Sequence, residues 1–160
     1  MRFYATVPMG LEEISSKEIE ELGGRILGIR KGKGRVFFEG DRELVPKLNF
    51  FSRTLERVLI LIENTHIDEL KDIYRCMKSL DYSFIKPYQS FAIRSLRVGE
   101  HEFTSMDISR EAGQGVIDSY MLGKGHRLRV DLDNPDVIIR VDLIHDELFV
   151  GLDTTGDNAL

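Results

Sequence analysis

Residues 91–119, FAIRSLRVGEHEFTSMDISREAGQGVIDS, carry the pattern that decides the fold of this chain. Apolar residues at the start of the stretch alternate with smaller or polar ones, which predicts a strand over 89–97 because successive strand side chains point to opposite faces. Thr104 followed three residues later by Asp107 is typical of a helix N-terminus and predicts a helix over 104–122. The stretch is therefore a strand that leads through a short loop into a helix.

The flanking sequence extends this pattern on both sides. Upstream, apolar residues recur at helical spacing and predict an amphipathic helix over 65–80, with Thr65 and Asp68 as its capping box and a further turn of helix over 82–87. Downstream, short apolar runs bounded by turn residues predict three strands. These strands cover 127–131, 137–143 and 147–152. The expected order after residue 64 is α-α-β-α-β-β-β.

The first 63 residues follow a different order. Apolar runs predict four strands, and one-sided apolar spacing predicts two helices. The strands cover 3–7, 25–30, 34–39 and 56–63, and the helices cover 11–22 and 45–53. The order β-α-β-β-α-β is that of the ferredoxin-like fold. We therefore expect an α+β protein with a ferredoxin-like domain over 1–63, a second domain over 64–155, and the start of a linker over 156–160.

Composition limits the possible functions. The formal net charge of −5 argues against unspecific binding to nucleic acid, so any such binding must depend on local patches. The single cysteine, Cys76, excludes a disulfide framework within the chain. No signal peptide is evident, and no apolar stretch approaches the roughly 20 residues of a membrane span. We expect a cytoplasmic protein without a membrane partner.

Motifs for catalysis are incomplete in this sequence. The triplets Gly32/Gly34, Gly113/Gly115 and Gly123/Gly125 each lack the third glycine of a dinucleotide-binding loop. The four histidines do not have the spacing of helical metal ligands, and no serine, cysteine and histidine form a local nucleophilic arrangement. We expect no catalytic residue, no metal and no cofactor site in this segment.

A first group of basic residues falls on the predicted hairpin over 25–39. Residues 22–38 contain five basic side chains and no acid, with Lys31 and Lys33 at the turn. Such a tip can follow phosphates along a nucleic acid. A charged, solvated hairpin that protects the edge of the sheet explains the same pattern equally well.

A second group lies between residues 86 and 129. Regular pleating turns Arg94 away from the apolar face of its strand, and Arg97 stands where that strand ends. The following helix N-terminus favours a phosphate, because its first amides have no helical acceptor. Thr104 can serve there both as a cap and as a hydroxyl donor. The candidate RNA-binding residues are Lys86, Arg94, Arg97, His101, Thr104, Ser105, Lys124 and Arg127, together with Lys31 and Lys33 of the hairpin.

Three segments resemble the THUMP-containing methyltransferases that act on tRNA or rRNA guanosine. They are RFYATVPMGLE at 2–12, the stretch 91–119, and VDLDNPDVIIRVDLIHDELFVGLDTTG at 130–156. The resemblance implies a ferredoxin-like domain followed by a THUMP domain that binds the acceptor region and 3′ end of tRNA. It also implies a covalently linked catalytic domain that uses S-adenosylmethionine and begins after the Leu-Asp-Thr-Thr-Gly stretch, where this sequence stops. Matching positions make Arg94, Arg97 and Thr104 binding candidates.

Two other interpretations stay open. THUMP domains also accompany thiouridine synthases, pseudouridine synthases and deaminases, so the binding role is compatible with other chemistry. From a different class, a regulatory ferredoxin-like module that binds a small molecule fits the acidic balance of the chain better.

Overall fold

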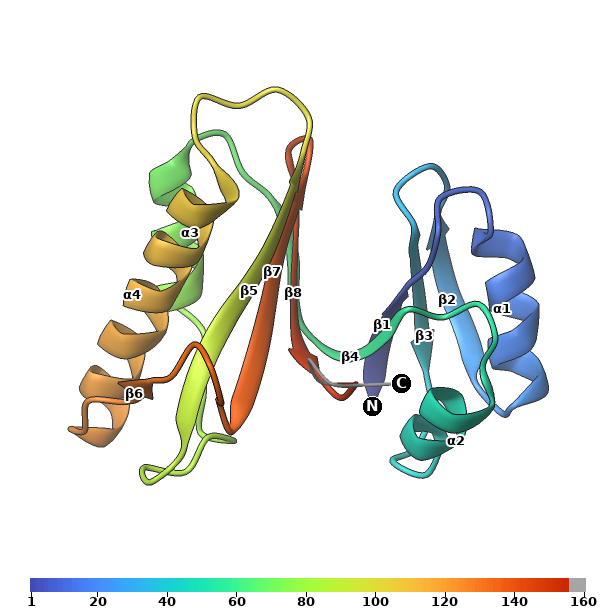
Figure 1. Cartoon of the computed structure of the whole chain (residues 1–160), viewed down its shortest axis with the longest axis horizontal. Coiled ribbons are helices and arrows are strands. Elements are labelled where there is room, and N and C mark those ends of the chain that lie inside the picture. The colour runs from blue at the N-terminus through green and yellow to red at the C-terminus, as the bar shows by residue number, and fades with distance from the viewer. Residues whose placement is uncertain (156–160) are drawn as a thin grey trace. The chain divides into compact units, whose positions relative to one another are not determined.

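The computed structural model, which describes residues 1–155, contains the element order predicted for the first 63 residues and, except for the helical turn over 82–87, the order predicted after residue 64 (Figure 1). The described chain divides into one unit over Met1–Ile62 and residues 151–155, and a second over Glu63–Val150. The expected linker over 156–160 lies outside the described residues.

The first unit has the expected β-α-β-β-α-β order. Its strands pair antiparallel in the order β2-β3-β1-β4. The elements are β1 (Arg2–Thr6), α1 (Glu12–Glu21), β2 (Arg25–Arg30), β3 (Arg35–Glu39), α2 (Leu44–Phe51) and β4 (Arg57–His66). The ferredoxin-like prediction is confirmed.

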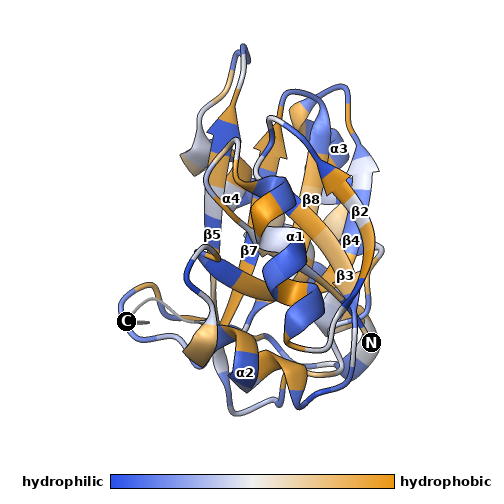
Figure 2. Cartoon of the chain, turned by 90° about the vertical axis from the view of Figure 1, so that its right-hand side faces the viewer, coloured by the Kyte–Doolittle hydropathy of each residue, from blue (hydrophilic) through white to orange (hydrophobic). Residues whose placement is uncertain are grey.

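An apolar core joins the sheet of this unit to its helices. Phe3 of β1 stacks on Phe38 of β3 with ring centroids 5.4 Å apart, and Ile19 of α1 is fully buried in the same cluster. Figure 2 shows hydrophobic strands behind α1, which itself carries many hydrophilic residues. Ile14 of α1 has the helical spacing of a core residue, but it is 58% exposed and Ser15 is buried in its place.

The second unit contains the predicted strand and helix over 91–119. Its sheet order is β8-β7-β5-β6, and β5 runs parallel to both of its neighbours. The elements after β4 are α3 (Leu70–Lys78), β5 (Ser90–Val98), α4 (Ser105–Lys124), β6 (Arg129–Val130), β7 (Val137–Ile144) and β8 (Glu147–Asp153). In Figure 1, α3 and α4 cover the same face of this sheet.

Three local predictions are corrected by the structure. Thr65 and Asp68 do not cap α3, because β4 continues to His66 and the capping box is formed by Glu69 and Asp72. Residues 82–87 form turns rather than a helix. Tyr82 and Ile85 are both buried, and the turns place these two side chains in the core. The strand predicted over 127–131 is only two residues long, because its pairing with β5 ends after Val130.

Helix α4 begins at the predicted cap and ends at Lys124, two residues beyond the predicted end. One of its glycines determines how it packs. Thr104 and Asp107 form the capping box, and Gly125 ends the helix in the left-handed conformation. A Cβ on Gly115 would lie 2.7 Å from Met77 Cβ and 3.0 Å from the Tyr74 carbonyl oxygen of α3. The two helices therefore approach closely at Gly115, which no other residue type would permit without a shift of α3.

Candidate nucleic-acid interface

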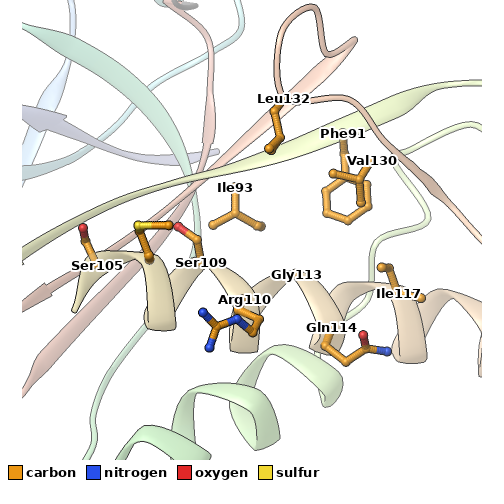
Figure 3. Close-up of a pocket in the computed structure, with 11 residues that line it drawn as sticks. Phe91, Ile93, Ser105, Ser109, Arg110, Gly113, Gln114, Ile117, Val130 and Leu132 are labelled. Carbon is orange, nitrogen blue, oxygen red and sulfur yellow. The ribbon is translucent and has the colours of Figure 1, made fainter. Parts of the chain in front are cut away.

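An open groove runs along α4 beside the start of β5 and the loop after β6 (Figure 3). It has a volume of about 450 Å³. Its floor is apolar, and Ser105, Ser109, Arg110 and Gln114 supply polar groups along α4. The apolar lining residues are Phe91, Ile93, Met106, Ile117, Val130 and Leu132. Apolar floors with a few polar groups at the edge are typical of ligand sites.

The local sequence explains why the groove stays open. Ser109 of α4 donates a hydrogen bond to Ser95 of β5 at 2.8 Å, which fixes the helix over the strand at this point. One turn further along α4, Gly113 presents no side chain, and a Cβ there would meet only Ile93 Cγ1, at 3.7 Å. The close packing of this helix thus occurs at Gly115, whereas Gly113 lines the groove.

The rim of the groove exposes several apolar side chains. Met106 is 74% exposed, Leu132 64% and Val130 47%. Large apolar side chains gathered around one groove mark an interaction site more often than isolated ones do. Sequence reasoning missed these three residues, because their spacing fits a core-facing pattern and only the tertiary structure shows that nothing covers them within the described residues.

Arg97 is held in place beyond the N-terminal end of this groove. Its guanidinium donates hydrogen bonds to the Gly99 carbonyl at 2.7 Å and to His101 Nδ1 at 2.9 Å. Arginine can only donate, so Nδ1 accepts and the Nε2–H of His101 donates to the His145 carbonyl at 2.7 Å. The chain of hydrogen bonds orients both side chains.

A second pocket adjoins His101 and has an acidic lining. It measures about 560 Å³ and includes Asp68, Glu100, His145 and Asp146. All three carboxylates belong to exposed residues. These carboxylates would repel a phosphate from this pocket. The part of the chain that the structure describes contains no group of three or more potential metal ligands.

The N-terminus of α4 already holds a carboxylate. Asp107 accepts hydrogen bonds from the Thr104 amide at 2.8 Å and the Thr104 hydroxyl at 3.1 Å. These bonds, with Arg110 beside the carboxylate, lower the pKa of Asp107. Thr104 is therefore occupied by capping. The amides of Ser105 and Met106 remain in the first turn, where a helix supplies no acceptor.

The remaining candidates of this unit are spread along α4. Arg94 donates to the Leu132 carbonyl at 2.8 Å, at the groove rim. Lys86, Lys124 and Arg127 are exposed at the C-terminal end of the helix. A helix of 20 residues is about 30 Å long, so the structure separates these three residues from Arg97, His101, Thr104 and Ser105.

The hairpin of the first unit is less positive than its sequence suggests. Lys31 pairs with Glu13 of α1 at 2.5 Å, which lowers the pKa of that carboxyl through a hydrogen bond and the nearby positive charge. Arg35 is buried and donates to the Lys33 and Gly34 carbonyls. At the turn itself, Lys31 is exposed and Lys33 is half-buried.

The residues described do not fit S-adenosylmethionine. Gly32 and Gly34 lie in the turn between β2 and β3, Gly113 and Gly115 lie inside α4, and Gly123 and Gly125 lie at its end. A nucleotide cofactor needs a glycine loop between a strand and the helix that follows, and none of these triplets occupies that place.

The fold and the groove define a two-domain α+β protein in which a ferredoxin-like unit precedes a mixed sheet flanked by two helices. Family models agree: residues 2–59 match the RlmL ferredoxin-like domain, and residues 68–153 match the THUMP domain. The chain belongs to the THUMP domain family. No helix among the described residues is long and apolar enough to span a membrane.

Similar proteins combine both domains with further sequence. The chain is 57% identical over its whole length to a tRNA (guanine(6)-N2)-methyltransferase of Archaeoglobus fulgidus, of which it covers 41%. It is 55% identical to the enzyme of the same name from Methanocaldococcus jannaschii, covering 43%. The crystal structure of TrmN from Thermus thermophilus matches 97% of the chain with a TM-score of 0.74 and 26% identity, and the chain covers 46% of it. The chain thus spans less than half of these relatives.

Proposed function

We propose that this chain is the RNA-capturing module of a tRNA guanine-N2 methyltransferase. It binds the acceptor region of tRNA and holds the unpaired 3′ end in the groove beside α4. The methyl transfer and the S-adenosylmethionine site belong to the part of the relatives that this chain does not cover. High sequence similarity to two tRNA methyltransferases over the full chain supports the parent activity.

The groove is the observation that carries this proposal. A duplex presents phosphates on its outside, whereas an unpaired strand presents the flat faces of its bases. Met106, Val130 and Leu132 at the rim offer exposed apolar surface to such faces, above the buried Phe91 and Ile93 of the floor. Stacking of a base on protein side chains contributes about 1–3 kcal/mol and tolerates any base.

Polar groups around the groove suit the strand's backbone. Ser105 and Met106 supply first-turn amides at one end of the groove, where a helix favours an anion. Arg94 lies by the Leu132 rim and Arg97 lies beyond the helix start. Arginine can also stack on an unpaired base, which lysine does poorly.

A charge placed at the groove rim tests this function. Met106 is largely exposed, so Met106→Glu leaves the core intact and brings a carboxylate to the strand's phosphates. We expect affinity for intact tRNA to fall about tenfold. Affinity for tRNA trimmed of its unpaired 3′ nucleotides should be unchanged by the substitution. The measurement is fluorescence anisotropy with both RNAs at one salt concentration.

The matched control is Ile14→Glu, which adds the same charge to an exposed apolar position of α1. It should leave both affinities close to those of the unaltered chain. Equal affinity of the unaltered chain for intact and trimmed tRNA would show that the 3′ end is not the ligand of the groove.

A further inference from the structure

One end of α4 gathers exposed cations around an exposed aromatic ring. We call this cluster, formed by Lys86, Tyr88, Lys124 and Arg127, the basic end. Tyr88 is 80% exposed, and the three cations are exposed as well. Tyr88 was not among the residues that the sequence indicated.

Contacts between distant segments bring the cluster together. The Tyr120 hydroxyl of α4 donates to the Ile85 carbonyl at 2.7 Å, which ties the 82–89 turns to the helix. Ser90 of β5 pairs in parallel with Arg129 of β6. The segments that precede these two strands, with Tyr88 and Arg127, therefore reach the same edge of the sheet.

Cations at the basic end are available to a partner. Lys86 and Lys124 form no ion pair with any residue that the structure describes, and Arg127 has Asp118 as an acidic neighbour. Aspartates also lie in the adjoining loops. The carboxylates of Asp131 and Asp136 there accept bonds from nearby amides instead of pairing with these cations.

Charge has the opposite sign at the other end of α4. Asp68, Glu100 and Asp146 line the pocket beside His101, and Arg97 is bonded to the protein itself. A duplex there would bring two rows of phosphates towards three carboxylates. A single strand that ends at the Ser105 amides would bring far less charge. The groove along α4 therefore lies between the basic end and the acidic pocket.

We infer that the RNA lies along α4 in one direction, with its paired stem at the basic end and the free 3′ terminus at Ser105. Lys86, Lys124 and Arg127 contact stem phosphates, and the Tyr88 ring stacks on the exposed face of the last base pair. The inference rests on the proposed function and adds the polarity of the strand and a surface for duplex RNA.

Three RNAs distinguish binding at the basic end from binding in the groove. They are a minihelix with a four-nucleotide unpaired 3′ overhang, the same minihelix with blunt ends, and the overhang as a free oligonucleotide. Tyr88→Ala, and separately Lys86→Ala with Lys124→Ala, should weaken both minihelices about tenfold and leave the oligonucleotide unaffected. Met106→Glu should weaken the overhang minihelix and the oligonucleotide but not the blunt minihelix.

Control variants distinguish a loss of stacking from a folding defect and from unspecific binding by exposed aromatic rings. Tyr88→Phe keeps the ring and should bind like the unaltered chain. Phe50→Ala removes an aromatic ring that is 81% exposed on α2 and should change no affinity. If Tyr88→Ala weakens the oligonucleotide and spares the blunt minihelix, the stated polarity is overturned. If the unaltered chain binds none of the three RNAs, the proposed function itself fails.

Positioned cleavage gives a direct map. In a Cys76→Ser background, an iron chelate attached at Tyr88→Cys should cut the overhang minihelix within its stem. The same chelate at Met106→Cys should cut the last unpaired nucleotides. Cleavage in the reverse order would contradict the inference.

Discussion

At the scale of single residues, Glu12 shows how one buried carboxylate joins two turns. It is 3% exposed and accepts hydrogen bonds from the Gly10 amide at 3.0 Å and the Gly34 amide at 3.1 Å. Gly34 has a positive φ, and a Cβ there would lie 2.4 Å from the Val7 carbonyl oxygen. The carboxylate thus fixes the hairpin between β2 and β3 to the start of α1. Gly10 and Glu12, which take part in this contact, both belong to the RFYATVPMGLE stretch.

Removing this carboxylate should destabilise the chain. Glu12→Ala leaves two amides without their acceptor, which costs about 1–3 kcal/mol for each buried group left unpaired. We expect a lower urea midpoint with an unchanged slope. Glu13→Ala is the control, since its exposed pair with Lys31 adds little to stability. Equal midpoints for Glu12→Ala and the unaltered chain would refute the role given to Glu12.

At the scale of elements, two glycines of α4 have opposite consequences. In a helix interior, alanine is more favourable than glycine by about 1 kcal/mol. Gly113→Ala adds a methyl group at ordinary contact distance from Ile93 and should raise stability by about that amount. Gly115→Ala forces α3 away from α4, and overpacking of this kind costs about 1–3 kcal/mol.

Thermal unfolding of the two variants decides this prediction. Their transition temperatures should move in opposite directions from that of the unaltered chain. A similar decrease in both variants would mean that Gly113 is as tightly packed as Gly115. The added methyl group of Gly113→Ala should also narrow the groove. Because this variant is expected to be more stable, a loss of tRNA affinity would come from the groove and not from unfolding.

At the scale of the whole molecule, a chain with a net charge of −5 can bind RNA only through the placement of its cations. Lys31 and Lys33 at the first unit's hairpin remain a predicted sequence-independent contact. Lys31 must leave Glu13 to reach a phosphate, and exposed pairs of this kind are weak. The hairpin is therefore available at little cost.

Salt dependence measures this contribution. Lys31→Ala with Lys33→Ala should weaken all RNAs about equally. The slope of log affinity against log salt should fall by about 1 for each phosphate that the variant no longer binds. Glu13→Ala, which frees Lys31, should not weaken binding. An unchanged slope in the double variant would identify the hairpin as a solvated edge of the sheet.

The sequence by itself determined most of the order of elements and the N-terminal cap of α4. These features depend on periodicity and on residues three or four apart, which a single sequence displays directly. Thr104, Asp107 and Gly125 are examples, since each acts on its own helix. The resemblance to THUMP proteins was visible for the same reason, because its segments are contiguous.

Only the tertiary structure decided which residues share a surface. Thr65 has the chemistry of a cap, yet strand pairing extends β4 through it; Ile14 has the spacing of a core residue, yet it lies in solvent. Glu13 reaches Lys31 from a different element, and Lys86 and Arg97 lie at opposite ends of α4. Contacts between residues far apart in the chain depend on how packed elements approach one another. A single sequence carries no local signal for that approach.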